Sequence, residues 1–275
     1  MFNRKVLKSR AKSVLATSYW QTFGTMLLLS IATTAVGNLF TLKIPPTITL
    51  NSVVTIAIFG VTLLMRSILQ FAASVFLLLP LQVGFNRYLL DYANGGVPGL
   101  NSVGYAFRNN YKGIVWTVLA KQLIILIFTL VPVIAAGIVL VYVLLRSGYV
   151  LPTTINTAQV ERLTMYLSES PEYALVSIVL LILMIPAIMK IYDYYLVEYI
   201  IAEDSSLSWR EALAKSKKLM CGNRFATFLL GLSFLGWELL GILAFGIGSV
   251  FVTPYILATD TQLYLELSGK SKFEF

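Results

Sequence analysis

Long runs of apolar residues alternate with short polar segments along the chain, and this pattern predicts membrane-spanning helices. About 20 consecutive apolar residues are enough for a helix to cross the hydrocarbon core of a bilayer. The predicted spans cover residues 19–40, 66–88, 115–143, 174–200, 225–245 and 249–267. The last two are separated only by the short "GIGS" segment, which predicts a tight helical hairpin. Its small residues, including Gly241 and Gly248, predict that the two helices approach each other closely.

The second run is longer than one span. Apolar sequence is nearly continuous from Val53 to Leu81, which covers about 43 Å as a helix. That length exceeds one crossing and is too short for two. We expect residues 66–88 to cross the membrane and residues 53–65 to form either a helical extension or a re-entrant segment.

Two further segments combine an apolar face with basic residues and predict amphipathic helices at the membrane surface. Residues 1–18 form the first, whose apolar face consists of Leu7, Ala11, Val14, Leu15 and Ser18. Residues 208–221 form the second, on the cytoplasmic side, and Ser208 and Glu211 predict a capping box at its start. The basic residues of these segments are candidate contacts for lipid headgroups: Arg4, Lys5, Lys8, Arg10, Lys12, Lys215, Lys217 and Lys218.

The distribution of Lys and Arg among the loops predicts the orientation of the spans. Basic residues gather in the N-terminal tail, in the loops after the second and fourth spans, and at the C-terminus, whereas the opposite side has Lys43, Arg146 and Arg162. Cytoplasmic loops carry the excess of Lys and Arg. We therefore expect a multi-pass protein of the cell membrane with both termini in the cytoplasm. A separate crossing by residues 53–65 would invert this bias, so we reject seven spans.

The amino-acid composition also indicates that most of the chain lies in a membrane. Hydrophobic residues make up 57% of the 275 residues and charged residues 12%, and the mean hydropathy is +0.79. Since no polar block is long enough to form a core of its own, we expect one all-α integral membrane domain over residues 1–275. The formal net charge of +8 is then expected to face the anionic inner leaflet rather than nucleic acid.

The composition also restricts the chemistry. The chain contains no His and a single Cys, Cys221, which argues against disulfides, His-bearing metal sites and imidazole-dependent triads. No nucleotide-binding lysine loop is present. The "GLSFLG" segment around Ser233 is similar to an intramembrane serine protease motif, but no His is available as its base. We therefore expect no enzyme activity, no catalytic residue, no cofactor and no metal site.

Four ionisable residues inside the predicted spans are candidates for a buried polar or ion site, because charge is costly in hydrocarbon. Glu238 and Asp260 fall near mid-depth of the last two spans, where they could share a proton or a cation, or be held by Lys190. Lys190 and Asp193 are three residues apart on the fourth span. In the alternative, structural interpretation, Glu238 is neutral and hydrogen-bonded to a neighbouring helix, and Lys190 reaches the cytoplasmic interface.

Several stretches resemble a known family. "LMIPAIMKIYDYYLVEYIIAED" at 183–204, together with residues 211–241 and 246–267, resembles an uncharacterised family of polytopic bacterial membrane proteins, common in Gram-positive bacteria. The family is catalogued as domain of unknown function nine-seventy-five. The resemblance implies six spans and carries no established activity. Glu238 and Asp260 stand where acids are not typical of the family, so a function that rests on them would be particular to this chain.

Two functions are consistent with these observations. In the first, the protein is a scaffold or accessory component, or acts in envelope stress or self-protection, with membrane lipids and another membrane protein as partners. In the second, it is a small secondary transporter or channel that uses Glu238, Asp260, Lys190 and Asp193. A transporter needs a water-filled polar cavity that reaches these residues, whereas a scaffold is packed throughout.

Overall fold

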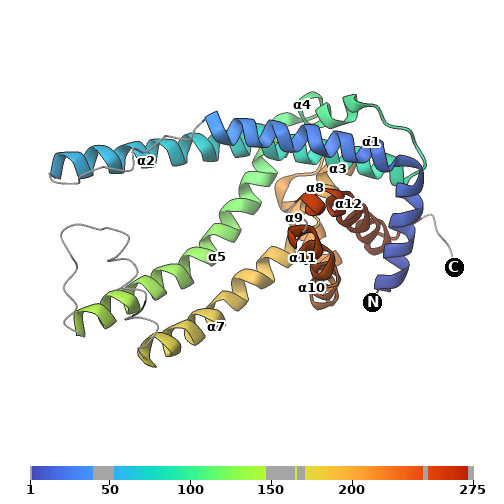
Figure 1. The fold of residues 1–275 in the computed structure, drawn as a ribbon. Coiled ribbons are helices and arrows are strands. Elements are labelled where there is room, and N and C mark those ends of the chain that lie inside the picture. Colours follow the sequence, from blue (N-terminus) through green and yellow to red (C-terminus); the bar gives the residue numbers. More distant parts are fainter. Residues whose placement is uncertain (1, 40–52, 147–164, 166–170, 244–246, 272–275) are drawn as a thin grey trace. The chain divides into compact units, whose positions relative to one another are not determined.

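The computed structural model describes residues 2–39, 53–146, 165, 171–243 and 247–271 of the chain. These described residues form helices and connecting segments, with no strand among them, which confirms the predicted all-α class for this part of the chain. The chain divides into two units, one of residues 1–41, 67–121 and 192–275, and one of residues 42–66 and 122–191. Figure 1 shows the helices of both units.

The helices have the following bounds. In chain order they are α1 (Arg4–Leu39), α2 (Val53–Ala73), the π-helical turn η1 (Ser74–Leu78), α3 (Leu79–Ala93), the 3-10 turn η2 (Leu100–Gly104), α4 (Tyr105–Arg108), α5 (Tyr111–Arg146), α7 (Pro171–Asp193), α8 (Val197–Glu203), α9 (Trp209–Met220), α10 (Arg224–Leu232), α11 (Leu235–Leu243) and α12 (Ile247–Leu267). The "GIGS" segment includes Gly246, which lies outside the described residues.

Four helical segments in the described part of the chain are long and apolar enough to cross a membrane. They are Val61–Ala93, Tyr111–Val139, Ser177–Glu203 and Arg224–Leu243, and they overlap the second to fifth predicted spans. The first and sixth predicted spans are helical, within α1 and α12, but neither is among these four. The structure therefore supports a membrane protein with several apolar helices, and the total of six spans stays a prediction.

The second predicted span is part of a longer helix. Helical structure continues from Val53 to Ala93 through α2, η1 and α3, without a turn at residues 53–65. This agrees with the helical extension rather than the re-entrant segment. The π-helical turn at Ser74–Leu78 widens the helix locally, and the Ser74 hydroxyl donates a hydrogen bond to the Gln70 carbonyl at 2.8 Å.

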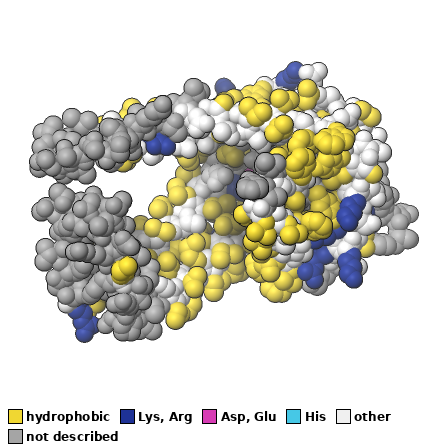
Figure 2. All heavy atoms as spheres, in the orientation of Figure 1, with side chains coloured by type: hydrophobic (Ala, Val, Ile, Leu, Met, Phe, Trp, Pro, Cys, Tyr) yellow, Lys and Arg dark blue, Asp and Glu magenta, His cyan; other side chains and the backbone are white. Residues whose placement is uncertain are grey.

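In the second unit, the apolar side chains of α5 and α7 face outward. Ile127 and Ile138 on α5 are 61% and 66% exposed, and Leu181 on α7 is 69% exposed. Figure 2 shows hydrophobic side chains at the surface over large areas of the described part. A helix that is apolar on all sides and not covered by protein is suited to contact with lipid.

The core of the first unit forms around α12, which packs against α1, α3 and α11. Leu263, Tyr264 and Gln262 of α12 are almost completely buried. Apolar and polar residues are mixed around this helix, as expected when protein covers several of its sides. At Gly248, an added Cβ would lie 2.6 Å from the Gly241 Cα, so α11 and α12 approach closely, as the glycines predict.

The first half of α1 differs from the predicted interfacial helix. Its apolar face packs onto protein: Leu7 lies in a cluster with Leu230 and Leu263, and Leu15 lies in a cluster with Ala258. No break in the helix separates this half from the predicted first span, although Figure 1 shows that α1 bends along its length. The pattern predicted correctly which face of α1 is buried. It predicted incorrectly that the membrane surface rather than protein covers this face, because an apolar face fits lipid and protein equally well.

The cytoplasmic amphipathic segment forms α9, which begins with the predicted capping box. The Ser208 backbone N–H donates to the Glu211 carboxylate at 2.9 Å, and the Glu211 N–H donates to the Ser208 hydroxyl at 3.4 Å. The apolar face of α9 is buried in the core of the first unit, through residues that include Ala212 and Met220. This face therefore contacts protein rather than lipid headgroups.

Removal of this cap is expected to loosen the start of α9. In Ser208→Ala, amide exchange in the first turn should become about fivefold faster at pH 7, since the Glu211 N–H is left without its acceptor, the Ser208 hydroxyl. Hydrogen–deuterium exchange of the full chain in mild detergent measures this, with the exposed Lys217→Ala on the same helix as the control.

The effect of Ser208→Ala on amide exchange is expected to depend on pH. The hydrogen bonds from the Ser208 side chain and backbone hold the pKa of Glu211 below its ordinary value of 4.5. The stability that the capping box contributes through ionised Glu211 is therefore fully present above pH 4.5, and it is lost as the pH falls through the lowered pKa of Glu211. The difference between Ser208→Ala and the unchanged chain should shrink in acid, and a difference of equal size at pH 7 and at a pH below the lowered pKa of Glu211 would contradict this role.

Candidate functional site

Two of the four candidate ion-site residues are tied to neighbouring helices in the first unit. Asp193, at the end of α7, has a side chain that is 3% exposed, and its Oδ1 lies 2.5 Å from Nη2 of Arg224 on α10. Asp260, on α12, accepts a hydrogen bond from the Tyr195 hydroxyl at 2.7 Å. The first contact joins α7 to α10, and the second joins α12 to the turn between α7 and α8, as structural polar contacts would.

The other two candidates have different surroundings. Glu238 is exposed on α11, and within the described residues its side chain makes no hydrogen bond or ion pair. The hydrogen bond that the structural interpretation gives to Glu238 is therefore not found in this part of the chain. Lys190 belongs to the second unit, where its ammonium lies 5.3 Å from the centre of the Phe128 ring. No three Asp, Glu or Cys side chains come together as possible metal ligands within the described ranges.

A break in the fourth predicted span positions Asp193 and Tyr195. The turn at residues 194–196 separates α7 from α8. Ser216 of α9 supports this turn, because its hydroxyl donates to the Asp193 carbonyl at 2.8 Å and accepts from the Leu196 N–H at 3.3 Å. The turn contains no Gly or Pro, so its sequence has no local signal for a break.

A second close ion pair joins α5 to α8 in the first unit. The Lys121 ammonium lies 2.5 Å from the Glu198 carboxylate, and the two side chains are 12% and 13% exposed. Lys121 lies near the predicted cytoplasmic end of its span, where a long side chain can reach water. The burial of both side chains depends on how the helices pack.

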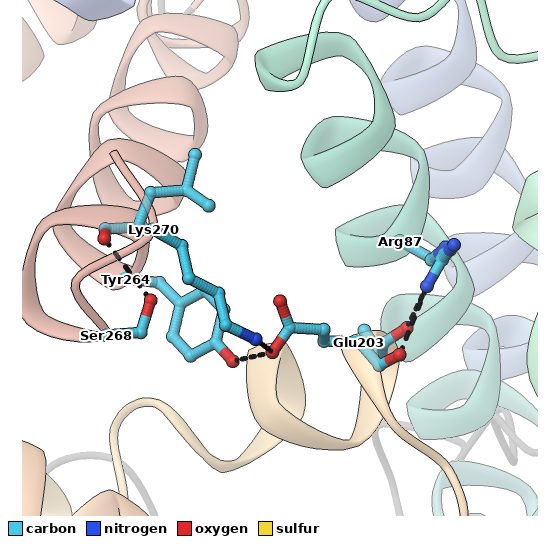
Figure 3. A network of polar contacts seen from close by, with 7 residues as sticks. Arg87, Glu203, Tyr264, Ser268 and Lys270 are labelled. Carbon is cyan, nitrogen blue, oxygen red and sulfur yellow. Dashed lines mark hydrogen bonds and ion pairs between the residues drawn. The ribbon is translucent and has the colours of Figure 1, made fainter. Parts of the chain in front are cut away.

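A third group of polar contacts surrounds the end of α8 and is shown in Figure 3. The Glu203 carboxylate accepts from the Tyr264 hydroxyl at 2.8 Å and from the Lys270 ammonium at 2.6 Å. Arg87 of α3 donates to the backbone carbonyls of Ala202 and Glu203 at 3.3 and 3.2 Å. Carbonyls at the end of a helix lack partners within it, so this group caps α8 and connects it to α3 and α12.

Several basic residues of α1 that were candidate headgroup contacts have protein partners. Arg10 is buried, and its guanidinium lies 2.5 Å from the Glu266 carboxylate. Arg4 and Lys8 donate to the backbone carbonyls of Leu229 and Ser233, at 3.3 and 3.1 Å. These carbonyls lie at the end of α10, where the turn at residues 233–234 interrupts the predicted fifth span.

The remaining basic candidates are more accessible. The side chains of Lys5, Lys12, Lys217 and Lys218 are exposed, and that of Lys215 is half-buried. The Lys12 ammonium lies 5.7 Å from the centre of the Tyr255 ring. These lysines remain predicted contacts for lipid headgroups.

Two open grooves flank Trp20 of α1 in the first unit. One is bordered by α1 and by Tyr255 of α12. The other lies between α1, the end of α3 and residues 97–100. Neither groove has Glu238, Asp260, Lys190 or Asp193 in its lining.

Comparison with known proteins gives a family and no further relative. A family model described as "Protein of unknown function (DUF975)" matches residues 1–271. No curated protein and no solved structure matches the chain. The family match agrees with the resemblance of the three stretches between residues 183 and 267 and covers almost the whole sequence. The chain therefore belongs to DUF975, a family of proteins of unknown function.

Proposed function

We propose that the protein is a non-enzymatic, multi-pass component of the cell membrane that acts as a scaffold or accessory protein for another membrane protein. Both termini lie in the cytoplasm in this proposal, and a role in envelope stress or self-protection is the alternative to the scaffold or accessory role. The positions of several buried charged residues support a structural use of them. Asp193 pairs with Arg224, and Lys121 pairs with Glu198, and such contacts hold helices together in an apolar medium.

The carrying observation is the exposed carboxylate of Glu238. It lies within the apolar segment Arg224–Leu243, and its neighbours Trp237 and Leu239 are each 57% exposed. A carboxyl group that faces lipid is costly unless a partner binds it. A hydrogen-bond donor or a basic residue on a helix of another protein would provide that partner, and the surrounding apolar side chains would pack against the same helix.

Pull-down of the tagged full chain from native membranes in mild detergent tests this proposal. Glu238→Leu should reduce the recovery of a co-purifying membrane protein about tenfold, as expected when an interhelical contact of 1–2 kcal/mol is lost. Leu181→Ala, which removes an exposed apolar side chain from α7 and leaves the segment around Glu238 unchanged, serves as the control. Equal recovery with Glu238→Leu and with the unchanged chain would overturn the assignment of Glu238 to a partner.

The alternative is a small secondary transporter or channel that uses Glu238, Asp260, Lys190 and Asp193. The position of Asp260 within the sixth predicted span favours this alternative, because an ionisable residue inside a span can mark a transport path. However, neither Glu238 nor Asp260 lines either of the two grooves beside Trp20. Loss of a measured ion flux in Glu238→Gln with Asp260→Asn, with partner recovery unchanged, would favour this alternative.

A further inference from the structure

The two grooves lie on either side of Trp20, and α1 forms a wall of both. Trp20 is 72% exposed and lines both grooves. Its ring is held edge-on by Tyr19, at 5.4 Å between ring centres, and by Phe23, at 5.9 Å. Each groove has a volume of about 590 Å³, within the range of small-molecule sites.

A single row of α1 residues connects the grooves. Lys12, Ala16, Trp20, Gly24 and Leu28 recur every four residues and line one groove or both. Residues at this spacing form a continuous ridge along a helix. The row covers about 24 Å of helix from its first to its last residue, measured along the bent axis of α1, and one bilayer leaflet with its headgroups is about 20–22 Å thick.

The two ends of this row differ in chemistry. At the first end, the exposed Lys12 has no carboxylate partner within the described residues, in contrast to Arg10, which pairs with Glu266. Thr17 lines the same groove. At the other end, the lining is mostly apolar and includes Leu28 and Leu100. A ligand that fits both ends carries a negative charge at one end and a long apolar chain at the other.

We propose that these grooves together bind one anionic phospholipid. Its phosphate lies at Lys12, and one acyl chain passes Trp20 and lies over Gly24 towards Leu28. This site is distinct from the proposed contact at Glu238 and does not depend on it. In this site, the exposed Trp20 acts as an interfacial aromatic residue, and its ring lies against the part of the acyl chain nearest the headgroup.

The glycines of α1 allow a selective block of the acyl-chain groove. A Cβ added at Gly24 meets no atom within 4 Å, and Gly24 lines the groove, so Gly24→Leu places a side chain in the groove from an open position. Gly37 is equally open and lies on the same helix outside both grooves. Gly37→Leu is therefore a matched control, since both changes raise helix propensity equally.

Native mass spectrometry of the full chain in mild detergent, titrated with phosphatidylglycerol or phosphatidylcholine of identical acyl chains, tests the site. We expect one phosphatidylglycerol to be retained in preference to phosphatidylcholine. Lys12→Gln should weaken the binding of phosphatidylglycerol about fivefold, the effect of one lysine at an anionic lipid surface, while the exposed Lys5→Gln should leave it unchanged. Gly24→Leu should weaken the binding of both lipids about tenfold, and Gly37→Leu should not.

The position of the acyl chain has its own readout. In a chain that keeps Trp20 and has the other three tryptophans replaced by Phe, brominated phosphatidylglycerol should quench the fluorescence, and Gly24→Leu should reduce that quenching. Equal binding of the two lipids, equal effects of Lys12→Gln and Lys5→Gln, or quenching that Gly24→Leu leaves unchanged would each overturn the proposed site. These outcomes would mean that the lipid around α1 is unspecific.

Discussion

Lys121→Met is expected to lower the free energy of unfolding by about 3–5 kcal/mol, because it leaves the Glu198 carboxylate buried without its cation. The ion pair is close, at 2.5 Å, and both side chains are largely covered. The double variant Lys121→Met with Glu198→Leu should recover most of this loss, since it removes both charges and keeps an apolar contact between α5 and α8. Unfolding in mixed detergent micelles, followed by circular dichroism, measures all three free energies.

A more exposed pair on the same unit is the control for this cycle. Arg87 and Asp91 lie one helical turn apart on α3 at 3.2 Å, with side chains 34% and 32% exposed. Asp91→Ala should cost less than about 1 kcal/mol, as exposed pairs do. If Lys121→Met were no more harmful than Asp91→Ala, the contact between α5 and α8 would not be a structural tie.

Gly84→Ala is expected to lower the free energy of unfolding by about 3 kcal/mol, the upper part of the range for overpacking. An added Cβ would overlap the backbone carbonyl oxygen of Val103 in η2, and it would lie 2.6 Å from the Val103 carbonyl carbon. Since this neighbour is backbone, α3 and η2 would have to move apart. The same unfolding measurement applies to this variant.

Gly37→Ala is the matched change for this prediction. Its Cβ meets no atom within 4 Å, and an alanine in a helix is favoured over glycine by up to about 1 kcal/mol. We therefore expect a small gain in stability there and a large loss at Gly84. A gain at both positions would show that α3 and η2 do not approach each other as the structure has them.

The glycines of the last hairpin could be predicted from the sequence to make a close contact, whereas Gly84 could not. The glycines of the last hairpin could be identified because they lie in two adjacent apolar runs, and the close approach at Gly241 and Gly248 follows. Gly84 contacts a short turn that precedes α5 and follows a loop. No periodic pattern marks that contact, so its importance depends on the tertiary structure.

The sequence alone determined the class of the protein, the positions of its apolar helices and the cap of α9. The physical reason is that lipid offers no hydrogen bonds to the backbone, so a long apolar run has to form a helix, and that a cap is a local interaction between neighbouring residues. The charged candidates were also visible, since few charged residues occur inside apolar runs.

Tertiary structure decided which groups these residues contact. The apolar face of α1 meets α12, Asp193 meets Arg224, and the fourth predicted span breaks at residues 194–196. An apolar face has the same pattern whether lipid or protein covers it, and the partner of a buried charge depends on the rotation and the depth of two helices that are far apart in sequence.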